Sequence, residues 1–392
     1  MTDTITGTDR TYEQKRSAYR LDFPILENET YLNHAAHAPW SLKSIAAMNG
    51  FMDSLCHGPM LPYPEWDKNL LRTRTLMAEF LNAEVEEIGF NYNTSLSLIL
   101  LTHSIRWKEG DNIIVPDRSF PAVVMPAKLL QQWGVEARVV PVKNRLADED
   151  MLIGAIDSRT KMMIVPLVNF FTGLRLDIPK LAKACRDAGV FLAVDAIQAA
   201  GPIKIDVRKL GCHALCFGSP KWMFGPMGIG TLFIEKESLD SLLIPQVGMH
   251  SVRDAWNFFN YDQEIIPETR RYECGVHMHL AHFGINPNLE MFLDLGTENT
   301  EKYLLNLTGY LHDQLVKRGV DVVTPRDDSR RAAIVTFEAK SAGWDNADAI
   351  FEKLDKADIR VSVRMGMIRV SPHFYNTTEE IDRLLNGVFR DS

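Results

Sequence analysis

Strand-like and helical segments alternate along the chain from about Ile88 to Ile234. The clearest strands are short apolar runs rich in β-branched residues, and they occupy residues 113–116, 137–142, 161–168, 190–195 and 230–234. Strands separated by helical stretches are typical of βαβ units, in which successive strands run parallel and helices cover both faces of the sheet. We therefore expect an α/β fold with a mostly parallel, doubly wound sheet in the larger part of the chain.

The pattern changes after residue 280. Long helical runs lead to shorter strands at residues 332–339, 358–364 and 367–372, and a final helix begins near Thr377. That order predicts a smaller α+β domain at the C-terminal end. The predicted division is an N-terminal arm that belongs with the small domain, a large domain and a small C-terminal domain, over residues 1–25, 26–280 and 281–392.

One strand of the large domain ends in an acid. Residues 190–194 form an apolar run of the length expected for a fully buried parallel strand, and Asp195 follows it directly. Ligands of open α/β sheets bind beyond the carboxyl ends of the strands, so this acid lies where functional groups gather. The alternative is that Asp195 only caps the next turn. The segment that follows favours the functional interpretation over this alternative.

That segment contains a lysine in apolar surroundings. Lys221 lies in a turn between the apolar runs 215–217 and 222–224. Burial there would lower the pKa of the amine and leave it nucleophilic, whereas a surface turn lysine is the simpler alternative. A buried lysine and a buried acid together fit pyridoxal phosphate, because the lysine holds the aldehyde as a Schiff base and the acid keeps the ring nitrogen protonated. We therefore expect pyridoxal 5′-phosphate as the cofactor.

Two further segments bear on the cofactor. Thr94 and Ser95 follow a strand-like run and open an apolar helix, and a helix N-terminus of this kind binds phosphate, although both residues are also ordinary caps. The loop at residues 225–230 has the glycine order G-x-x-G-x-G, the reverse of the dinucleotide fingerprint, and it leads into a strand. This order argues against a nicotinamide cofactor.

Together these segments resemble the class V aminotransferase family, in the fold-type-I group of pyridoxal-phosphate enzymes. That group includes cysteine desulfurases, selenocysteine lyases, kynureninases and isopenicillin N epimerase. The likeness runs from about Tyr31 to the C-terminus. The segments that carry it are residues 31–36, 93–95, 194–198, 221–222 and 368–377.

The resemblance implies a cofactor role for eight residues. Lys221 would hold the cofactor as a Schiff base and move protons at Cα, and Asp195 would pair with the pyridine nitrogen. The remaining contacts would come from Thr94, Ser95, Ser219, Phe120, Gln198 and Asn169. The three hydroxyls would hold the phosphate and Phe120 would stack on the ring. Gln198 would bond the phenolic oxygen, and Asn169 would lie beside the cofactor's oxygen or the substrate.

Three residues are implied at the substrate. Arg369 would bind the α-carboxylate as a bidentate fork, a task for which lysine is poorly shaped. Asn33 and His34 would line the substrate entrance. The simpler alternatives are a surface ion pair for Arg369 and an ordinary turn for Asn33 and His34.

The reaction implied by the resemblance begins when a primary amine, most simply an amino acid, displaces Lys221 and forms an external aldimine. Lys221 then removes the Cα proton. We expect epimerase- or aminotransferase-like chemistry. The alternative is a lyase that eliminates a β-substituent or cleaves a C–S or Cβ–Cγ bond, and a remote alternative is a non-catalytic, cofactor-binding regulatory protein.

Two departures from the family pattern bear on the reaction. Desulfurases of this group carry a mobile nucleophilic cysteine in the C-terminal domain. The cysteines here are Cys56, Cys185, Cys212, Cys216 and Cys274, so the loop expected to carry the thiolate, around residues 360–367, has none. Persulfide chemistry on a protein thiol is therefore disfavoured. Val276 stands where family members often have a threonine that reaches the neighbouring subunit's phosphate.

Composition narrows the class of partner. A net charge of −8 argues against nucleic acid or an anionic membrane, and the apolar share of 46% is that of a globular protein. With no secretory signal and no transmembrane-length run, a cytoplasmic enzyme is expected.

Cys212 and Cys216 lack further ligands at metal-binding spacing, so no metal is expected. The resemblance also implies a homodimer with active sites at the interface.

Overall fold

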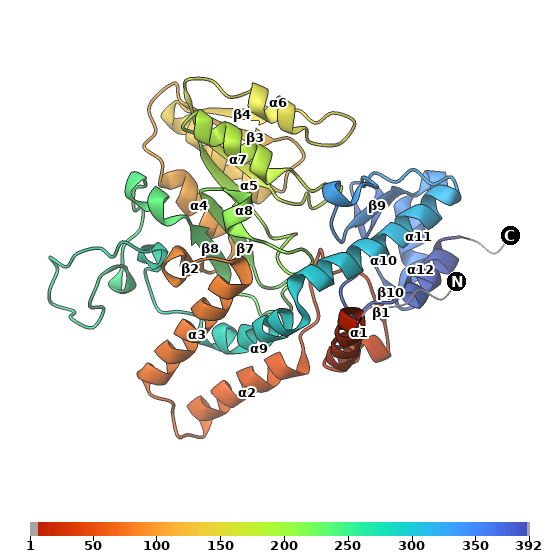
Figure 1. The fold of residues 1–392 in the computed structure, drawn as a ribbon, viewed down its shortest axis with the longest axis horizontal. Coiled ribbons are helices and arrows are strands. Elements are labelled where there is room, and N and C mark those ends of the chain that lie inside the picture. Colours follow the sequence, from red (N-terminus) through yellow and green to blue (C-terminus); the bar gives the residue numbers. More distant parts are fainter. Residues whose placement is uncertain (1–6, 390–392) are drawn as a thin grey trace.

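The computed structural model describes residues 7–389 of the chain, so the first six residues of the predicted arm lie outside the described part. Figure 1 shows a large unit built around a central sheet and a smaller unit on the right. Helices α9 (His279–Leu295) and α10 (Thr297–Lys317) follow one another and lead from the first unit to the second.

The large sheet has seven strands. They are β2 (Ile88–Asn91), β3 (Asn112–Pro116), β4 (Glu136–Val140), β5 (Thr160–Pro166), β6 (Phe191–Asp195), β7 (Ala214–Gly218) and β8 (Gly230–Ile234). Their order is β2-β8-β7-β6-β5-β3-β4, and neighbours are parallel except in the two pairs that include β8. The predicted mostly parallel α/β sheet is confirmed.

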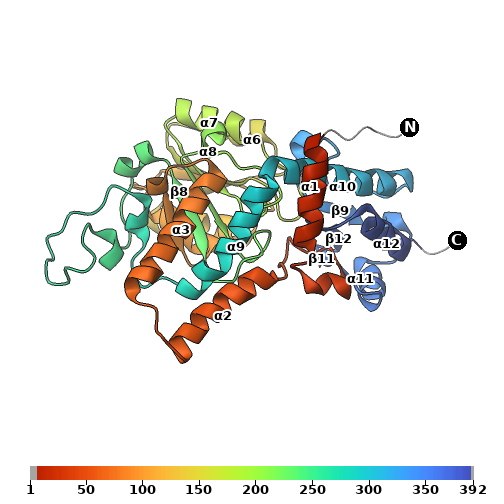
Figure 2. The same ribbon diagram turned by 60° about the horizontal axis from the view of Figure 1, so that its bottom comes forward.

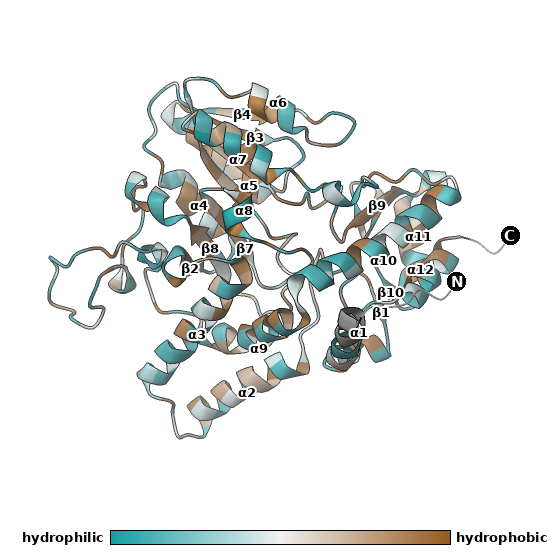
Figure 3. Ribbon diagram, viewed as in Figure 1, coloured by the Kyte–Doolittle hydropathy of each residue, from teal (hydrophilic) through white to brown (hydrophobic). Residues whose placement is uncertain are grey.

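Helices cover both faces of this sheet, which explains why its strands are apolar throughout. The helices of the large unit before α9 are α2 (Leu42–Cys56), α3 (Tyr63–Leu81), α4 (Thr94–His103), α5 (Pro121–Leu129), α6 (Glu149–Gly154), α7 (Ile178–Asp187) and α8 (Val207–Leu210). Along β5, Ile164 packs in the apolar cluster that contains Leu98 of α4, and Val165 packs in the cluster that contains Leu181 of α7. Figure 3 shows the resulting apolar strands at the centre of the unit.

The smaller unit combines helices with two short sheets. Besides α10 it contains α1 (Gly7–Arg20), α11 (Ala347–Lys356), α12 (Thr378–Val388), β1 (Thr30–Tyr31), β9 (Val335–Glu338), β10 (Ile359–Arg360), β11 (Ser362–Arg364) and β12 (Met367–Val370). Strands β11, β12 and β9 form an antiparallel sheet, and β1 pairs with β10 in parallel. Figure 2 shows β9, β11 and β12 grouped with α11 and α12.

The predicted elements differ from the structure at two places. The strand expected at residues 358–364 is divided, because β10 pairs with the N-terminal β1 whereas β11 turns back onto β12. Strand β7, immediately before the Lys221 turn, is absent from the predicted strands. Its residues are buried throughout, and their apolar run is too short to distinguish a strand from a helix by periodicity.

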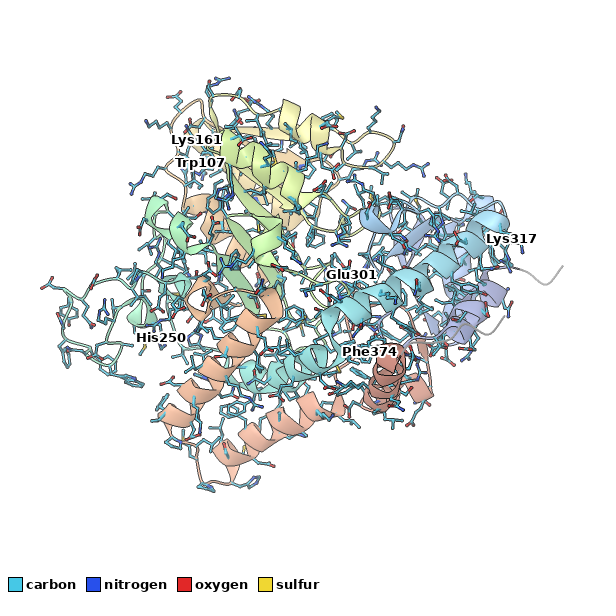
Figure 4. All side chains as sticks on the ribbon, viewed as in Figure 1. Trp107, Lys161, His250, Glu301, Lys317 and Phe374 are labelled. Carbon is cyan, nitrogen blue, oxygen red and sulfur yellow. The ribbon has the colours of Figure 1, made fainter. Side chains whose placement is uncertain are left out.

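The two units are joined by specific contacts as well as by chain connections. Glu301 of α10, labelled in Figure 4, accepts a hydrogen bond from Arg175 at 2.5 Å and one from the backbone of Lys204 at 2.8 Å. Helix α1 lies against the small unit, where Arg20 forms an ion pair with Glu380 at 2.8 Å. Helix α9 packs on α2 and α3, although the predicted domain boundary falls at its first turn, and the division into domains stays a prediction.

Candidate active site

Most of the predicted cofactor residues follow the carboxyl ends of strands in the large sheet. Asp195 ends β6, Asn169 follows β5 and Lys221 follows β7. Thr94 begins α4 directly after β2, and Phe120 lies between β3 and α5. Since parallel strands all end at one edge of the sheet, the topology gathers these five residues on the side where α/β proteins bind ligands.

Asp195 is a buried carboxylate with a raised pKa. Its side chain is 2% exposed, and Oδ1 accepts a hydrogen bond from the backbone N–H of Ile197 at 3.0 Å. Burial raises its pKa to about 6, while that hydrogen bond and the charge of Lys221 act in the opposite direction. A carboxylate held this way gains most from a cationic partner, such as a protonated pyridine nitrogen.

Lys221 is a partly buried amine with a lowered pKa. Burial lowers the pKa to about 8; the charge of Asp195 opposes this shift, whereas those of Arg369 and Arg364 add to it. The Nζ atom lies 5.5 Å from the ring centroid of Phe120, which in turn meets Phe170 edge-on at 5.4 Å. The predicted lysine and the predicted stacking ring therefore lie beside one another.

The turn around Lys221 is packed so closely that it requires glycine. The Ser219 hydroxyl donates to the carbonyl of Pro226, and the Gly225 N–H donates to the carbonyl of Ser219 at 3.0 Å. A Cβ on Gly225 would lie 2.6 Å from Cβ of Ser219, which no real side chain tolerates. The glycine loop thus folds tightly beside the lysine and makes no dinucleotide site.

The N-terminus of α4 lies beside the same turn. Asn93 caps the helix by accepting from the Leu96 N–H at 2.9 Å, and Thr94 is buried whereas Ser95 is exposed. A Cβ on Gly218 would lie 3.4 Å from the Thr94 hydroxyl oxygen, and one on Gly230 would lie 2.6 Å from the Asn93 backbone. Two glycines thus leave room at a helix N-terminus, where unpaired N–H groups attract phosphate.

The two predicted amides are engaged within the protein. Gln198 donates to the Ala35 carbonyl at 3.1 Å and accepts from the Trp222 indole at 2.7 Å. Asn169 accepts from the backbone N–H groups of Phe171 and Thr172, both at 2.9 Å. These bonds fix the walls of the site, and direct contact of either amide with the cofactor stays a prediction.

Arg369 of β12 reaches the site from the small unit. It is 1% exposed; Nη1 donates to the Phe170 carbonyl at 2.7 Å and Nε donates to the Ser362 hydroxyl at 3.2 Å. Its Nη2 is buried and has no hydrogen-bond partner among residues 7–389. Burial and, second, the charge of Arg364 lower its pKa to about 9. A buried, half-satisfied guanidinium is suited to bind an anion, because an unpaired buried charge is costly.

His34 and Asn33, which were predicted to line the substrate entrance, are placed differently from one another. His34 is 0% exposed, with Nδ1 hydrogen-bonded to the Ser371 carbonyl at 2.8 Å and Nε2 to the Tyr375 hydroxyl. Burial lowers its pKa to about 3, so this ring is a neutral link between the N-terminal segment and the strand end at Ser371. It presents no free nitrogen to a substrate here. Asn33 is partly buried, and its Oδ1 has no hydrogen-bond partner.

Arg364 is a site residue that the sequence analysis missed. It lies on β11, whose Ser362 stands opposite Arg369 of β12, so Arg364 shares a face with Arg369. The signal was present in the sequence, because two short strands around Met365-Gly366 form a hairpin in which alternate residues share one face. Placing that face required knowing the pairing register.

Metal-binding clusters and membrane-spanning helices are two further features relevant to function. Within residues 7–389, no group of three or more His, Cys, Asp or Glu side chains is arranged to hold a metal ion. Over the same residues, no helix is both long and apolar enough to cross a membrane.

The class V aminotransferase family matches residues 31–384 of the chain. An uncharacterized protein of Schizosaccharomyces pombe is 29% identical over 388 residues, which cover 95% of this chain and 87% of that protein. A probable cysteine desulfurase of Methanothermobacter thermautotrophicus is 25% identical over 386 residues, covering 93% of this chain and 95% of the relative.

Solved structures show the same fold. The apo cysteine desulfurase from Thermococcus onnurineus NA1 has a TM-score of 0.84 and 24% identity, covering 94% of this chain and 96% of that one. The cystine C-S lyase C-DES, solved with its reaction product cysteine persulfide, has a TM-score of 0.84 and 21% identity, covering 93% and 98%.

The fold and the lysine–acid pair thus define a fold-type-I pyridoxal-phosphate enzyme, as the sequence motifs predicted. The chain belongs to the class V aminotransferase family, and its cofactor is pyridoxal 5′-phosphate. The residues present fit that group: a low-pKa amine, a buried acid and a glycine-lined helix N-terminus lie on one edge of one sheet.

Proposed function

We propose that this protein acts on an amino acid by removing its Cα proton, with an epimerase- or aminotransferase-like outcome. The observation that carries the proposal is the Lys221 amine, whose pKa is lowered to about 8 by burial and whose Nζ lies 5.5 Å from the ring centroid of Phe120. An amine with a lowered pKa has a larger unprotonated fraction at the pH of most cells than an ordinary lysine, so it is better able to accept a proton.

When bound, pyridoxal phosphate supplies an electron sink joined to the substrate's amino group. We infer that Lys221 and Asp195 hold it at its aldehyde and its ring nitrogen. The other holding residues in this proposal are Thr94, Ser95, Ser219, Phe120, Gln198 and Asn169. Of these, Phe120 has the clearest support, because its ring already faces the Lys221 amine.

Arg369 orients the substrate in this proposal. Its Nη1 and Nε atoms are fixed by Phe170 and Ser362, which leaves Nη2 to bind the α-carboxylate. Holding that carboxylate restricts rotation of the substrate and presents one Cα–H bond to Lys221. Lys221 would take the proton from Cα. Delivery of that proton by Lys221 to the cofactor would give transamination, whereas epimerisation would need a proton delivered from solvent to the face of Cα opposite Lys221.

A lyase is the second candidate, because a relative that is 25% identical is a probable cysteine desulfurase. The name of that relative conflicts with the expectation that desulfurase chemistry is disfavoured, and an identity of 25% does not carry its activity over to this chain. Against a desulfurase, the hairpin between β11 and β12 contains no cysteine, and Cys274, the last cysteine of the chain, precedes α9.

Hydrogen exchange tests the proposal. Purified holoenzyme is incubated in D2O with single amino acids, and loss of the Cα proton signal is followed by NMR. We expect exchange for a subset of amino acids and a loss of ~100- to 10,000-fold in Lys221→Ala, which removes the base. Lys209→Ala, on the exposed surface of α8, is the control. Unchanged exchange in Lys221→Ala contradicts the proposal, and formation of alanine or pyruvate identifies a lyase.

A further inference from the structure

The sheet formed by β9, β12 and β11 directs one of its faces at the cofactor region. Arg369 stands opposite Thr336 on one side and Ser362 on the other, so these three residues share this face. The Thr336 hydroxyl donates to the carbonyl of Phe171 at 2.6 Å, and Arg369 donates to that of Phe170 at 2.7 Å. Both contacts are with the loop that follows β5, which identifies this face as the one turned toward the large unit.

Arg364 lies on the same face, two residues beyond Ser362 on β11. Its side chain is partly buried, and among the described residues its Nη1 donates only to the neighbouring carbonyl of Val363 at 2.8 Å. Its charge lowers the pKa values of two other basic side chains of the site, Lys221 and Arg369. Burial is the main cause of the lowered pKa of Lys221, and the charge of Arg364 lowers that pKa further, by less than the charge of Arg369 does. Burial is also the main cause of the lowered pKa of Arg369, and the charge of Arg364 is the second cause.

The protein supplies too few anions for these cations. Within residues 7–389, neither Arg364 nor Arg369 forms an ion pair with a carboxylate. The one acid on this face, Glu338, is paired with Arg145 at 2.7 Å. Asp195 is the partner predicted for the cofactor's ring nitrogen. An amino acid's α-carboxylate satisfies Arg369 and leaves the guanidinium of Arg364 unmatched.

We propose that Arg364 binds a second anionic group on the substrate, so that the amino acid turned over by this enzyme carries an acidic side chain. This inference rests on the proposed function and extends it to the class of substrate. The two guanidinium groups, on adjacent strands and one face, form a double anion site that selects a dicarboxylic amino acid over its neutral amide. Sulfinate and sulfonate side chains share the charge and acceptor oxygens that a guanidinium recognises.

Calorimetric titration of the full-length holoenzyme tests this inference apart from catalysis. The probes are glutarate and succinate, which have two carboxylates and no amine, and their monoamides. We expect each diacid to bind about 10- to 100-fold more tightly than its monoamide, the range for one charge-assisted hydrogen-bonding group. Equal affinities for diacid and monoamide would overturn the inference. Because these probes cannot react, this result does not depend on the proposed Cα chemistry.

Variants assign the effect to one side chain. Arg364→Gln is expected to remove the preference for the diacid by weakening diacid binding much more than monoamide binding, whereas Arg364→Lys keeps part of the preference. Arg360→Gln is the control, since Arg360 lies four residues earlier and pairs with Glu29 at 2.8 Å. An equal loss for diacid and monoamide in Arg364→Gln would show a structural role and overturn the inference. Arg364→Lys decides the question if the glutamine variant does not fold.

The same proteins are then titrated with aspartate, asparagine, glutamate and glutamine while the cofactor's absorption spectrum is followed. We expect the spectrum to respond to lower concentrations of the acids than of the amides in the wild type only. A spectrum that responds to none of the four, together with the expected diacid binding, would count against the proposed function and leave the double anion site standing.

Discussion

At the scale of single residues, burial shifts the pKa values of Asp195 and Lys221 in opposite directions. It raises the pKa of the acid to about 6 and lowers that of the amine to about 8. Both shifts follow from removing a charged group from water. The chain thus holds a carboxylate and an amine that are both destabilised as ions, and the proposed binding of an aldehyde at Lys221 and of a basic ring at Asp195 would relieve both.

The raised pKa of Asp195 predicts a pH-dependent stability. Because the folded protein binds the proton more tightly than the unfolded chain, the stabilising contribution is complete below about pH 4 and is lost as the pH rises through about 6. In urea unfolding of the cofactor-free protein, wild type should lose about 2–3 kcal/mol relative to Asp195→Asn across this window. Parallel stability curves for the two proteins would contradict the assigned burial of the acid.

The positions of Asp195 and Lys221 at the carboxyl ends of strands were largely predictable, because both residues lie at recognisable places in the strand pattern. The hydrogen bonding and placement of the neighbouring residues were not predictable. His34 was expected at the substrate entrance or in an ordinary turn, whereas the structure pairs both of its ring nitrogens with a segment more than three hundred positions away. Arg364 was missed for a related reason, since its position depends on strand register.

At the scale of elements, the site depends on close approach between the end of β8 and the beginning of α4. Gly230 pairs with Asn91 across β2 and β8, and its missing side chain makes room for the Asn93 backbone. The helix N-terminus can then lie beside the Lys221 turn. This approach explains the glycine at the start of β8.

Gly230→Ala tests this packing. The added Cβ would lie 2.6 Å from the Asn93 carbonyl carbon, so backbone must move at the cap of α4. We expect a loss of about 1–3 kcal/mol in stability and weaker retention of the cofactor, measured by urea unfolding and by equilibrium dialysis.

Gly50→Ala is the matched control, because Gly50 lies within α2 with nothing within 4 Å of the added carbon. It should stabilise the protein by about 0.5–1 kcal/mol, since alanine is the better helix former. Equal behaviour of the two variants would show that the contact between β8 and α4 is unimportant for cofactor binding.

At the scale of the whole molecule, the alternation of strands and helices was enough to predict the parallel sheet, and the shift after residue 280 was enough to predict the α+β unit. The strand order was not predictable, because β8 inserts between β2 and β7 from far along the chain. Nor was the pairing of β1 with β10, which brings the N-terminal segment into the small unit.

The expected homodimer leads to a prediction about surface residues. Figure 1 shows a segment projecting from the large unit on the side away from both chain ends, and Figure 4 places His250 there. In this region Phe259 and Tyr261 are 86% and 85% exposed. Apolar side chains this exposed are typical of interaction surfaces.

We expect light scattering after size-exclusion chromatography to give twice the chain mass for wild type, and a shift toward the monomer in Phe259→Asp and Tyr261→Asp. Val316→Asp, on the exposed side of α10, is the control and should leave the mass unchanged. A monomeric wild type, or aspartate variants that remain dimeric, would contradict this role for the projecting segment.

The central claim is that Lys221 holds the cofactor. The most direct test is to reduce the purified holoenzyme with borohydride, which fixes pyridoxal phosphate onto the lysine that binds it, and to locate the modified residue by peptide mass spectrometry. The account predicts a single phosphopyridoxyl group on Lys221. A group on any other lysine, or a protein that takes up no pyridoxal phosphate, would contradict it.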